Sequence, residues 1–120
     1  MNLPHNHDEK LGNITSVPSV EEFSKIADVF KLLDDSSRVR IFWLLCHCEQ
    51  CVINISALLE MSSPAVSHHL RILKAYGLIE SRREGKEVYY KASNNKDATV
   101  LHNMIEEFVE IKCPKYESDK

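Results

Sequence analysis

The stretch of residues 54–91 constrains the fold most, because the spacing of its apolar side chains changes from helical to alternating partway along. The expected helices are residues 54–60 and 64–76, and the expected strands are residues 78–82 and 87–91. A tight turn at Met61-Ser62 separates the two helices, which predicts a helix-turn-helix. The short connection Arg83–Lys86 between the strands predicts a β-hairpin.

Single residues mark the expected ends of these elements. Asn54 is a suitable N-cap for the first helix, and Ser63 is one for the second, directly before Pro64 at the first helical position. Gly77 can close the second helix, and Gly85 can take the positive φ that a hairpin turn needs. The local signals therefore agree with the periodicity.

Three more helices are expected around this unit. Ser19 and Glu22 form a capping box for a helix over residues 19–33, and Asp34-Asp35-Ser36 supplies the N-cap of a strongly apolar helix over residues 36–47. A last helix over residues 95–112 ends before Pro114. The predicted fold is mainly α with a β-hairpin wing, in the order α-α-α-α-β-β-α. We expect an arm at 1–18, a domain at 19–113 and a tail at 114–120.

Length and composition favour one water-soluble domain. The chain has 120 residues, of which 43% are hydrophobic, enough for one small core. Its longest apolar run, residues 41–46, is far shorter than the roughly 20 residues that span a bilayer, and its polar start does not resemble a secretory signal. We expect a cytoplasmic protein with no membrane partner.

Charge is distributed unevenly along the chain. The whole sequence has 15 basic and 18 acidic residues, yet residues 67–91 contain six Lys or Arg and three Glu. An acidic chain with one basic segment is typical of a protein that presents a single face to a polyanion such as double-stranded DNA. The expected DNA contacts are Ser62, Ser63, Ser67, His68, His69, Arg71 and Lys74 from the turn and second helix of the motif, and Arg82, Arg83 and Lys86 from the hairpin.

Three of the four cysteines lie close together as Cys46, Cys48 and Cys51. In a cytosolic chain this spacing favours metal binding or thiol chemistry over structural disulfides, and three thiolates can converge on one thiophilic ion. Two alternatives remain open. The thiols can sense oxidation, with Cys48 and Cys51 as the better disulfide pair, or they can be ordinary apolar side chains of the protein interior.

The sequence resembles the ArsR/SmtB family of metalloregulators over residues 20–112. Leu32–Ile41 is similar to the family's L-x-D-x-x-R-x-x-I/L motif, Ser63–Leu70 to its recognition helix and Arg83–Tyr90 to its wing. The resemblance implies a winged-helix homodimer that is joined through its first and last helices. It also implies a repressor that binds a palindromic operator and leaves it when a metal or metalloid inducer binds.

The resemblance also implies where zinc or another transition or thiophilic metal ion binds. The family's thiol motif E-x-C-V-C-D-x-C matches from Glu49 to Val52, but Ile53 and Ser56 replace its later cysteines. The family's D-x-H-x10-H-x2-E spacing on the last helix selects Asp97, Thr99, Glu110 and Cys113.

A mixed set on the last helix is the second expectation for the metal. His102, Glu106, Glu110 and Cys113 can pair across a two-fold axis, and otherwise the two glutamates form a solvated stripe. The arm adds His5, His7 and Asp8 as extra ligands.

Other classes of protein are disfavoured. The sequence contains no nucleophile–base pair, no glycine-rich phosphate loop and no H-E-x-x-H motif, so we do not expect an enzyme. A purely structural zinc module would unfold when a chelator removes its metal, whereas a metal sensor stays folded.

Overall fold

The structure is a computed structural model that describes residues 3–5 and 12–110. It divides into two compact units, Met1–Lys31 and Leu32–Lys120. Part of the expected arm, with His7 and Asp8, and the whole expected tail lie outside the described residues, as do Cys113 and Pro114. Within the described residues, no helix is both long and apolar enough to span a membrane.

Helix α1 (Val20–Leu32) begins at the predicted capping box. The Ser19 backbone N–H donates to Glu22 Oε1 at 2.9 Å, and the Glu22 N–H donates to Ser19 Oγ at 3.1 Å. These two bonds satisfy backbone donors that the first turn of a helix otherwise leaves unpaired. Several large apolar side chains of this helix are exposed, namely Val20, Phe23, Ile26 and Phe30.

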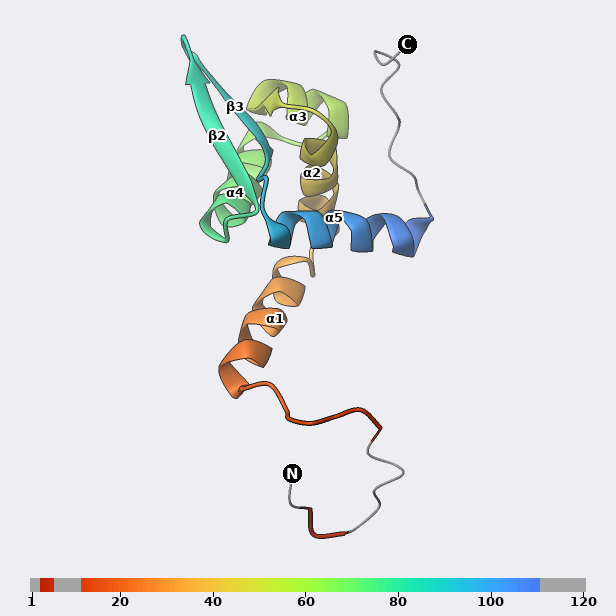
Figure 1. Cartoon of the computed structure of the whole chain (residues 1–120). Coiled ribbons are helices and arrows are strands. Elements are labelled where there is room, and N and C mark those ends of the chain that lie inside the picture. Colours follow the sequence, from red (N-terminus) through yellow and green to blue (C-terminus); the bar gives the residue numbers. More distant parts are fainter. Residues whose placement is uncertain (1–2, 6–11, 111–120) are drawn as a thin grey trace, which may run out of the picture. The chain divides into compact units, whose positions relative to one another are not determined.

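The second unit contains the remaining elements in nearly the predicted order (Figure 1). Its helices are α2 (Ser36–His47), α3 (Val52–Leu59), α4 (Ser63–Ala75) and α5 (Lys96–Val109), and its strands are β1 (Gln50–Cys51), β2 (Ile79–Glu84) and β3 (Glu87–Ala92). The strand β1 was not expected, because two residues are too few to show alternation. It pairs antiparallel with β3, Cys51 opposite Tyr89, and gives the strand order β1-β3-β2.

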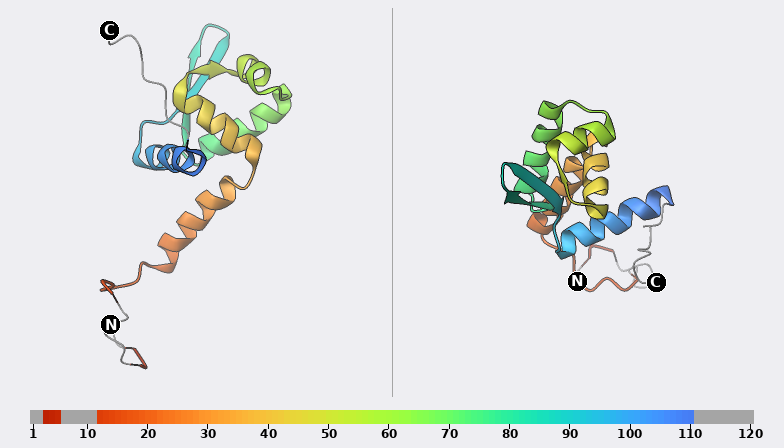
Figure 2. Two further views of the ribbon diagram at one scale, coloured as in Figure 1. Left: turned by 90° about the vertical axis from the view of Figure 1, so that its right-hand side faces the viewer. Right: turned by 90° about the horizontal axis from the view of Figure 1, so that it is seen from above.

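Helix α2 lies at the centre of this unit. It contacts α3, α4, α5 and β3, and Figure 2 shows α4 and α5 on opposite sides of it. Its Ile41 and Phe42 side chains are completely buried, and Leu45 is nearly so. The rest of the core comes from the elements around it, chiefly Ile55, Val66, Leu70, Leu73, Leu78, Ile79, Ala98 and Leu101. The strong apolar character predicted for residues 36–47 is thus explained by burial on several sides.

Both helices of the helix-turn-helix have a different N-cap from the one that the sequence predicted. Helix α3 begins at Val52 after Cys51, not at Asn54, because the β1–β3 pairing keeps the chain extended up to Cys51. Asn54 instead donates from Nδ2 to Gln50 Oε1 at 3.0 Å. Ser62, not Ser63, caps α4, since its Oγ accepts from the Ala65 N–H at 3.2 Å.

Two glycines and one helix end fix the boundaries of the wing and of α5. Gly77 has φ +75° after α4, and its N–H donates to the Lys74 carbonyl, as predicted for a C-terminal cap. Gly85 has φ +64° in the two-residue turn between Glu84 and Glu87, so β2 runs two residues further toward the tip than expected, whereas β3 begins at Glu87 as expected. Helix α5 ends earlier than predicted, at Val109, where Glu110 adopts a left-handed conformation.

We expect Asp35→Ala to lower the free energy of unfolding by about 1 kcal/mol at pH 7, because Asp35 Oδ1 accepts from the Arg38 N–H at 3.1 Å as the N-cap of α2. This hydrogen bond holds the pKa of Asp35 below its ordinary value. The stabilisation is therefore complete at neutral pH and is lost as the pH falls through that lowered pKa. Urea unfolding at pH 7 and at acid pH measures the effect. Asp34→Ala is the matched control, and an equal loss from both variants would contradict the capping role.

Candidate DNA-contact surface and metal centre

One face of α4 presents polar side chains to solvent, beginning at the helix N-terminus. Ser62 and Ser63 are exposed there, and Arg71 and Lys74 are exposed further along, with Ser67 half-buried between them. His68 is exposed beside this row. Short hydroxyl side chains at a helix N-terminus followed by cations suit a helix that approaches a polyanion end-on.

His69 does not belong to this surface, which corrects our expectation. It is 8% exposed, and its Nε2 lies 3.8 Å from Asp35 Oδ1. Burial lowers the pKa of His69 below its ordinary value, although Asp35 acts in the opposite direction. The physical reason is its position, because His69 shares the buried face of α4 with Val66 and Leu73.

The three residues of the hairpin that were expected to contact DNA lie in two different environments. Arg83 and Lys86 are exposed at the tip. Arg82, in contrast, donates from Nε and Nη2 to the two carboxylate oxygens of Glu49 at 2.9 and 2.8 Å and from Nη1 to Glu84 at 2.6 Å. These bonds raise the pKa of Arg82 and lower that of Glu49. Arg82 therefore ties the wing to the segment after α2, and its charge is largely balanced.

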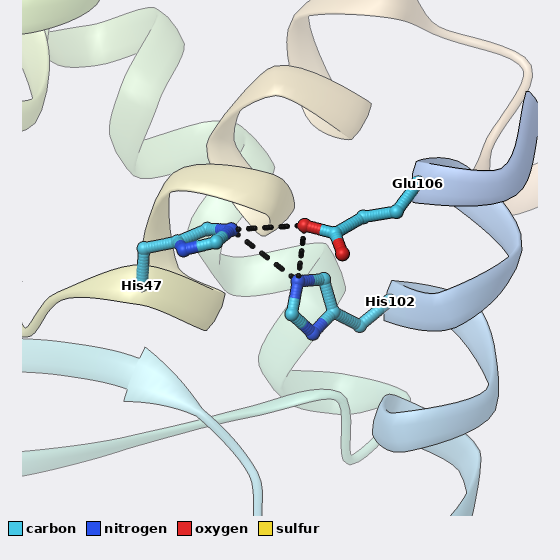
Figure 3. A group of neighbouring side chains, drawn as sticks. All are labelled: His47, His102 and Glu106. Carbon is cyan, nitrogen blue, oxygen red and sulfur yellow. Dashed lines mark hydrogen bonds and ion pairs between the residues drawn. The ribbon is translucent and has the colours of Figure 1, made fainter. Parts of the chain in front are cut away.

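A second group of candidate functional side chains lies where the end of α2 meets α5 (Figure 3). His47 Nε2 and His102 Nε2 are 3.3 Å apart, and each faces Glu106 Oε2, at 3.4 Å and 3.1 Å respectively. The three side chains are between 14% and 20% exposed. Among the described residues, each of these three side chains offers one potential metal-ligand atom, and the three atoms all lie within 4.8 Å of one another.

His102 and Glu106 were expected as ligands, but His47 was not. The spacing of four residues on one helix indicated the α5 pair, whereas His47 lies 55 residues earlier in the chain than His102. Its sequence signal, a histidine between Cys46 and Cys48, pointed to the thiols instead. The predicted companions on α5 are not part of the group in one chain, because Asp97 is exposed in the first turn and Glu110 is exposed at the C-cap.

The cysteines take separate positions. Cys46 and Cys48 are half-buried at the end of α2, and Cys51 is buried in β1. Cys48 Sγ lies 3.5 Å from the Leu44 carbonyl, to which it donates. In the described part of the chain these three thiols do not form a second group with all ligand atoms within 4.8 Å. The turn from α2 into the extended β1 separates them. His5 belongs to the other unit.

An open cleft of about 350 Å³ adjoins the histidines. Its lining includes Cys46, His47, Cys48, Lys91, Asn94 and His102. Both histidines and two of the thiols are therefore accessible from solvent by one route. A small ion or molecule that enters the cleft meets nitrogen and sulfur donors of α2 together with nitrogen donors of α5.

Comparison with known proteins assigns this architecture to a family. Residues 35–81 match the family model described as bacterial regulatory protein, arsR family. The chain is 38% identical over 85 residues to a homologue of the cadmium resistance transcriptional regulatory protein CadC from Staphylococcus aureus, covering 70% of each chain. It is 39% identical over 79 residues to a Synechocystis homologue of the transcriptional repressor SmtB, which is 66% of this chain and 60% of that relative's length.

A solved structure agrees with these matches. It is the homodimeric winged helix-turn-helix DNA-binding domain of a possible ArsR-family regulator from Mycobacterium bovis, with a TM-score of 0.66, 26% identity and coverage of 86% of this chain and 97% of that one. The winged helix-turn-helix, with α4 as its second helix and β2–β3 as its wing, is thus shared in sequence and in three dimensions. The chain belongs to the ArsR/SmtB family of winged-helix, DNA-binding transcriptional repressors.

Proposed function

We propose that a homodimer of this chain represses transcription at a palindromic operator and is released when a metal or metalloid ion binds. The observation that carries the proposal is the exposed polar face of α4, together with the exposed cations Arg83 and Lys86 at the tip of the hairpin. Its inducible part is supported by the names of two relatives, a SmtB homologue and a cadmium resistance regulator, and by the ligand group of His47, His102 and Glu106.

In this proposal α4 enters the major groove. Ser62, Ser63 and Ser67 lie close to base edges, and Arg71 and Lys74 contact phosphates. The wing tip, with Arg83 and Lys86, contacts the neighbouring backbone. Phosphate contacts of this kind release counterions, so the affinity falls steeply as salt is added.

Uncovered apolar surface supports the homodimer. Exposed large apolar side chains gather on α1 and on α5, namely Val20, Phe23, Ile26 and Phe30 on the first and Val100, Phe108 and Val109 on the second. Apolar surface of this extent usually marks an interface. A second copy is the occupant that we propose, because two recognition helices one turn of DNA apart read a palindrome and the Mycobacterium domain is homodimeric.

The ion site and the DNA-contact surface are connected through a short segment of chain. His47 ends α2, and Glu49, two residues later, holds Arg82 of β2 through two hydrogen bonds. An ion that fixes His47 to α5 therefore acts two residues from the anchor of the wing. A coupling free energy of about 1–3 kcal/mol would change operator affinity roughly 5- to 150-fold.

Thiol oxidation is the second candidate for the inducing event. Cys46 and Cys48 line the open cleft, where an oxidant can reach them. The disulfide we propose for this case joins Cys48 and Cys51, with the two thiol protons and two electrons passing to the oxidant. The buried Cys51 in β1 would have to leave its place opposite Tyr89, which again would disturb β3 of the wing.

Arg71→Ala and Arg83→Ala should each weaken DNA binding and reduce the salt slope by about 1, because each removes one phosphate contact. Arg82→Ala should change both quantities much less, since Glu49 and Glu84 already balance its charge. Fluorescence anisotropy on a palindromic duplex, selected from a random library by the wild-type protein, gives affinity against salt. Equal losses in all three variants, or none in Arg71→Ala and Arg83→Ala, would count against this docking.

Ion titration of the same complex tests the inducible step. Zn²⁺, Cd²⁺ and arsenite are added separately, and we expect at least one of them to lower operator affinity within the 5- to 150-fold range. Native mass spectrometry should show a bound ion that a chelator removes while the chain stays folded. Release only by an oxidant, with loss of two hydrogens and prevented by Cys48→Ser, would replace the metal with the thiol mechanism.

A further inference from the structure

We propose that His47, His102 and Glu106 of a single chain bind one Zn²⁺ ion, without the cysteines and without a ligand from a second copy. This inference deepens the proposed function, on which it rests for its biological role, by assigning the ion and its ligands. It replaces the expected site across the dimer axis with one inside each chain. The ligand atoms are His47 Nε2, His102 Nε2 and Glu106 Oε2.

The separations among these atoms match a tetrahedral zinc site. Ligands about 2.0–2.1 Å from Zn²⁺ at the tetrahedral angle are roughly 3.3 Å from one another. The three separations in the structure are 3.1, 3.3 and 3.4 Å. An ion can therefore be placed against all three atoms with little movement of the side chains, and three such atoms form one face of a tetrahedron.

The donor types determine which ions fit. Two imidazole nitrogens and one carboxylate oxygen are ligands of borderline metals such as Zn²⁺ and Co²⁺, and the same two-histidine, one-glutamate set occurs in zinc sites that keep an open position. Arsenite and Cu(I) prefer thiolates, which this group lacks. We assign the fourth position to water, because the cleft of about 350 Å³ reaches both histidines.

Neighbouring groups already orient the ligands. His102 and Glu106 lie one turn apart on α5, where backbone hydrogen bonds fix their spacing. The Trp43 ring packs on the His47 ring, with centroids 4.4 Å apart, and so limits the rotation of that imidazole. Support of this kind reduces the entropy that a ligand loses when it binds a metal.

Bound zinc would add coordinate bonds between two helices that already meet through side-chain packing and through the contacts of His47 with His102 and Glu106. His47 is the last residue of α2, and both other ligands are on α5. The ion therefore closes the chain between residues 47 and 102, which include the helix-turn-helix and the wing. Because of this position, zinc binding can change the orientation of the helix-turn-helix and the wing relative to α5.

Metal titration of the full-length protein tests the site directly. We expect one Zn²⁺ per chain, and intense visible absorption bands from Co²⁺ in a tetrahedral environment. Trp43, the single tryptophan of the chain, should change its fluorescence when His47 is ligated. Loss of second-shell partners lowers metal affinity about 10- to 100-fold, so His102→Gln and Glu106→Gln should lower it by at least about 100-fold.

Matched variants make the result specific. Glu107→Gln changes the exposed neighbour of Glu106, and Cys48→Ser changes a thiol of the cleft; both should bind zinc as the wild type does. Urea unfolding of each metal-free variant checks that it folds. Wild-type affinity in His102→Gln and Glu106→Gln, or loss of zinc in Cys48→Ser, would overturn the assignment.

Operator binding separates this inference from the proposed function. One possible outcome is that zinc binds as described but the protein stays bound to its operator. This outcome supports the zinc site and overturns release by zinc. Failure of the chain to bind any duplex overturns the proposed function, whereas the stoichiometry, the Co²⁺ spectrum and the Trp43 signal still decide the zinc site. Binding that requires two chains per ion in native mass spectrometry overturns the single-chain site.

Discussion

The burial of α2 is the constraint on which the second unit depends. Ile41 and Phe42 are completely buried, and the helix has α4 on one side and α5 on the other (Figure 2). Because a packed interior resists change, the position of α2 sets where both neighbours lie. The exposed face of α4 and the candidate ligands of α5 are thus held against the same helix. A change at the end of α2 therefore lies a short distance from the surface that we propose contacts DNA.

The segment after α2 joins the two functional regions. Cys51 pairs with β3, and Glu49 binds Arg82 of β2, so two residues of this segment hold the wing. His47, two residues before Glu49, belongs to the ligand group. Arg82 was expected to contact DNA, and in the structure its guanidinium donates hydrogen bonds to the carboxylates of Glu49 and Glu84. Charge alone does not distinguish an anchoring arginine from a phosphate-binding one.

Local signals predicted most elements correctly, and the errors lie where a long-range contact overrides them. Asp35, Ser19 and Gly77 cap their helices as expected, because capping depends on a few neighbouring residues. Asn54 was wrong as the N-cap because α3 begins earlier, at Val52, directly after Cys51 of β1, which pairs with Tyr89 of a distant strand. His69 was misplaced because only the packing of α4 decides which edge of the helix is covered.

The sequence alone determined the order of all elements except β1, the helix-turn-helix with its wing, the resemblance to one family and the pair His102 and Glu106 on one helix face. These properties depend on spacing and on residue type, which can be read from neighbouring positions. Only the tertiary structure decided that His47 joins that pair, that the three cysteines do not converge and that Glu49 holds Arg82. Each of these results depends on which distant segments the buried helix α2 brings together, and no local pattern records that.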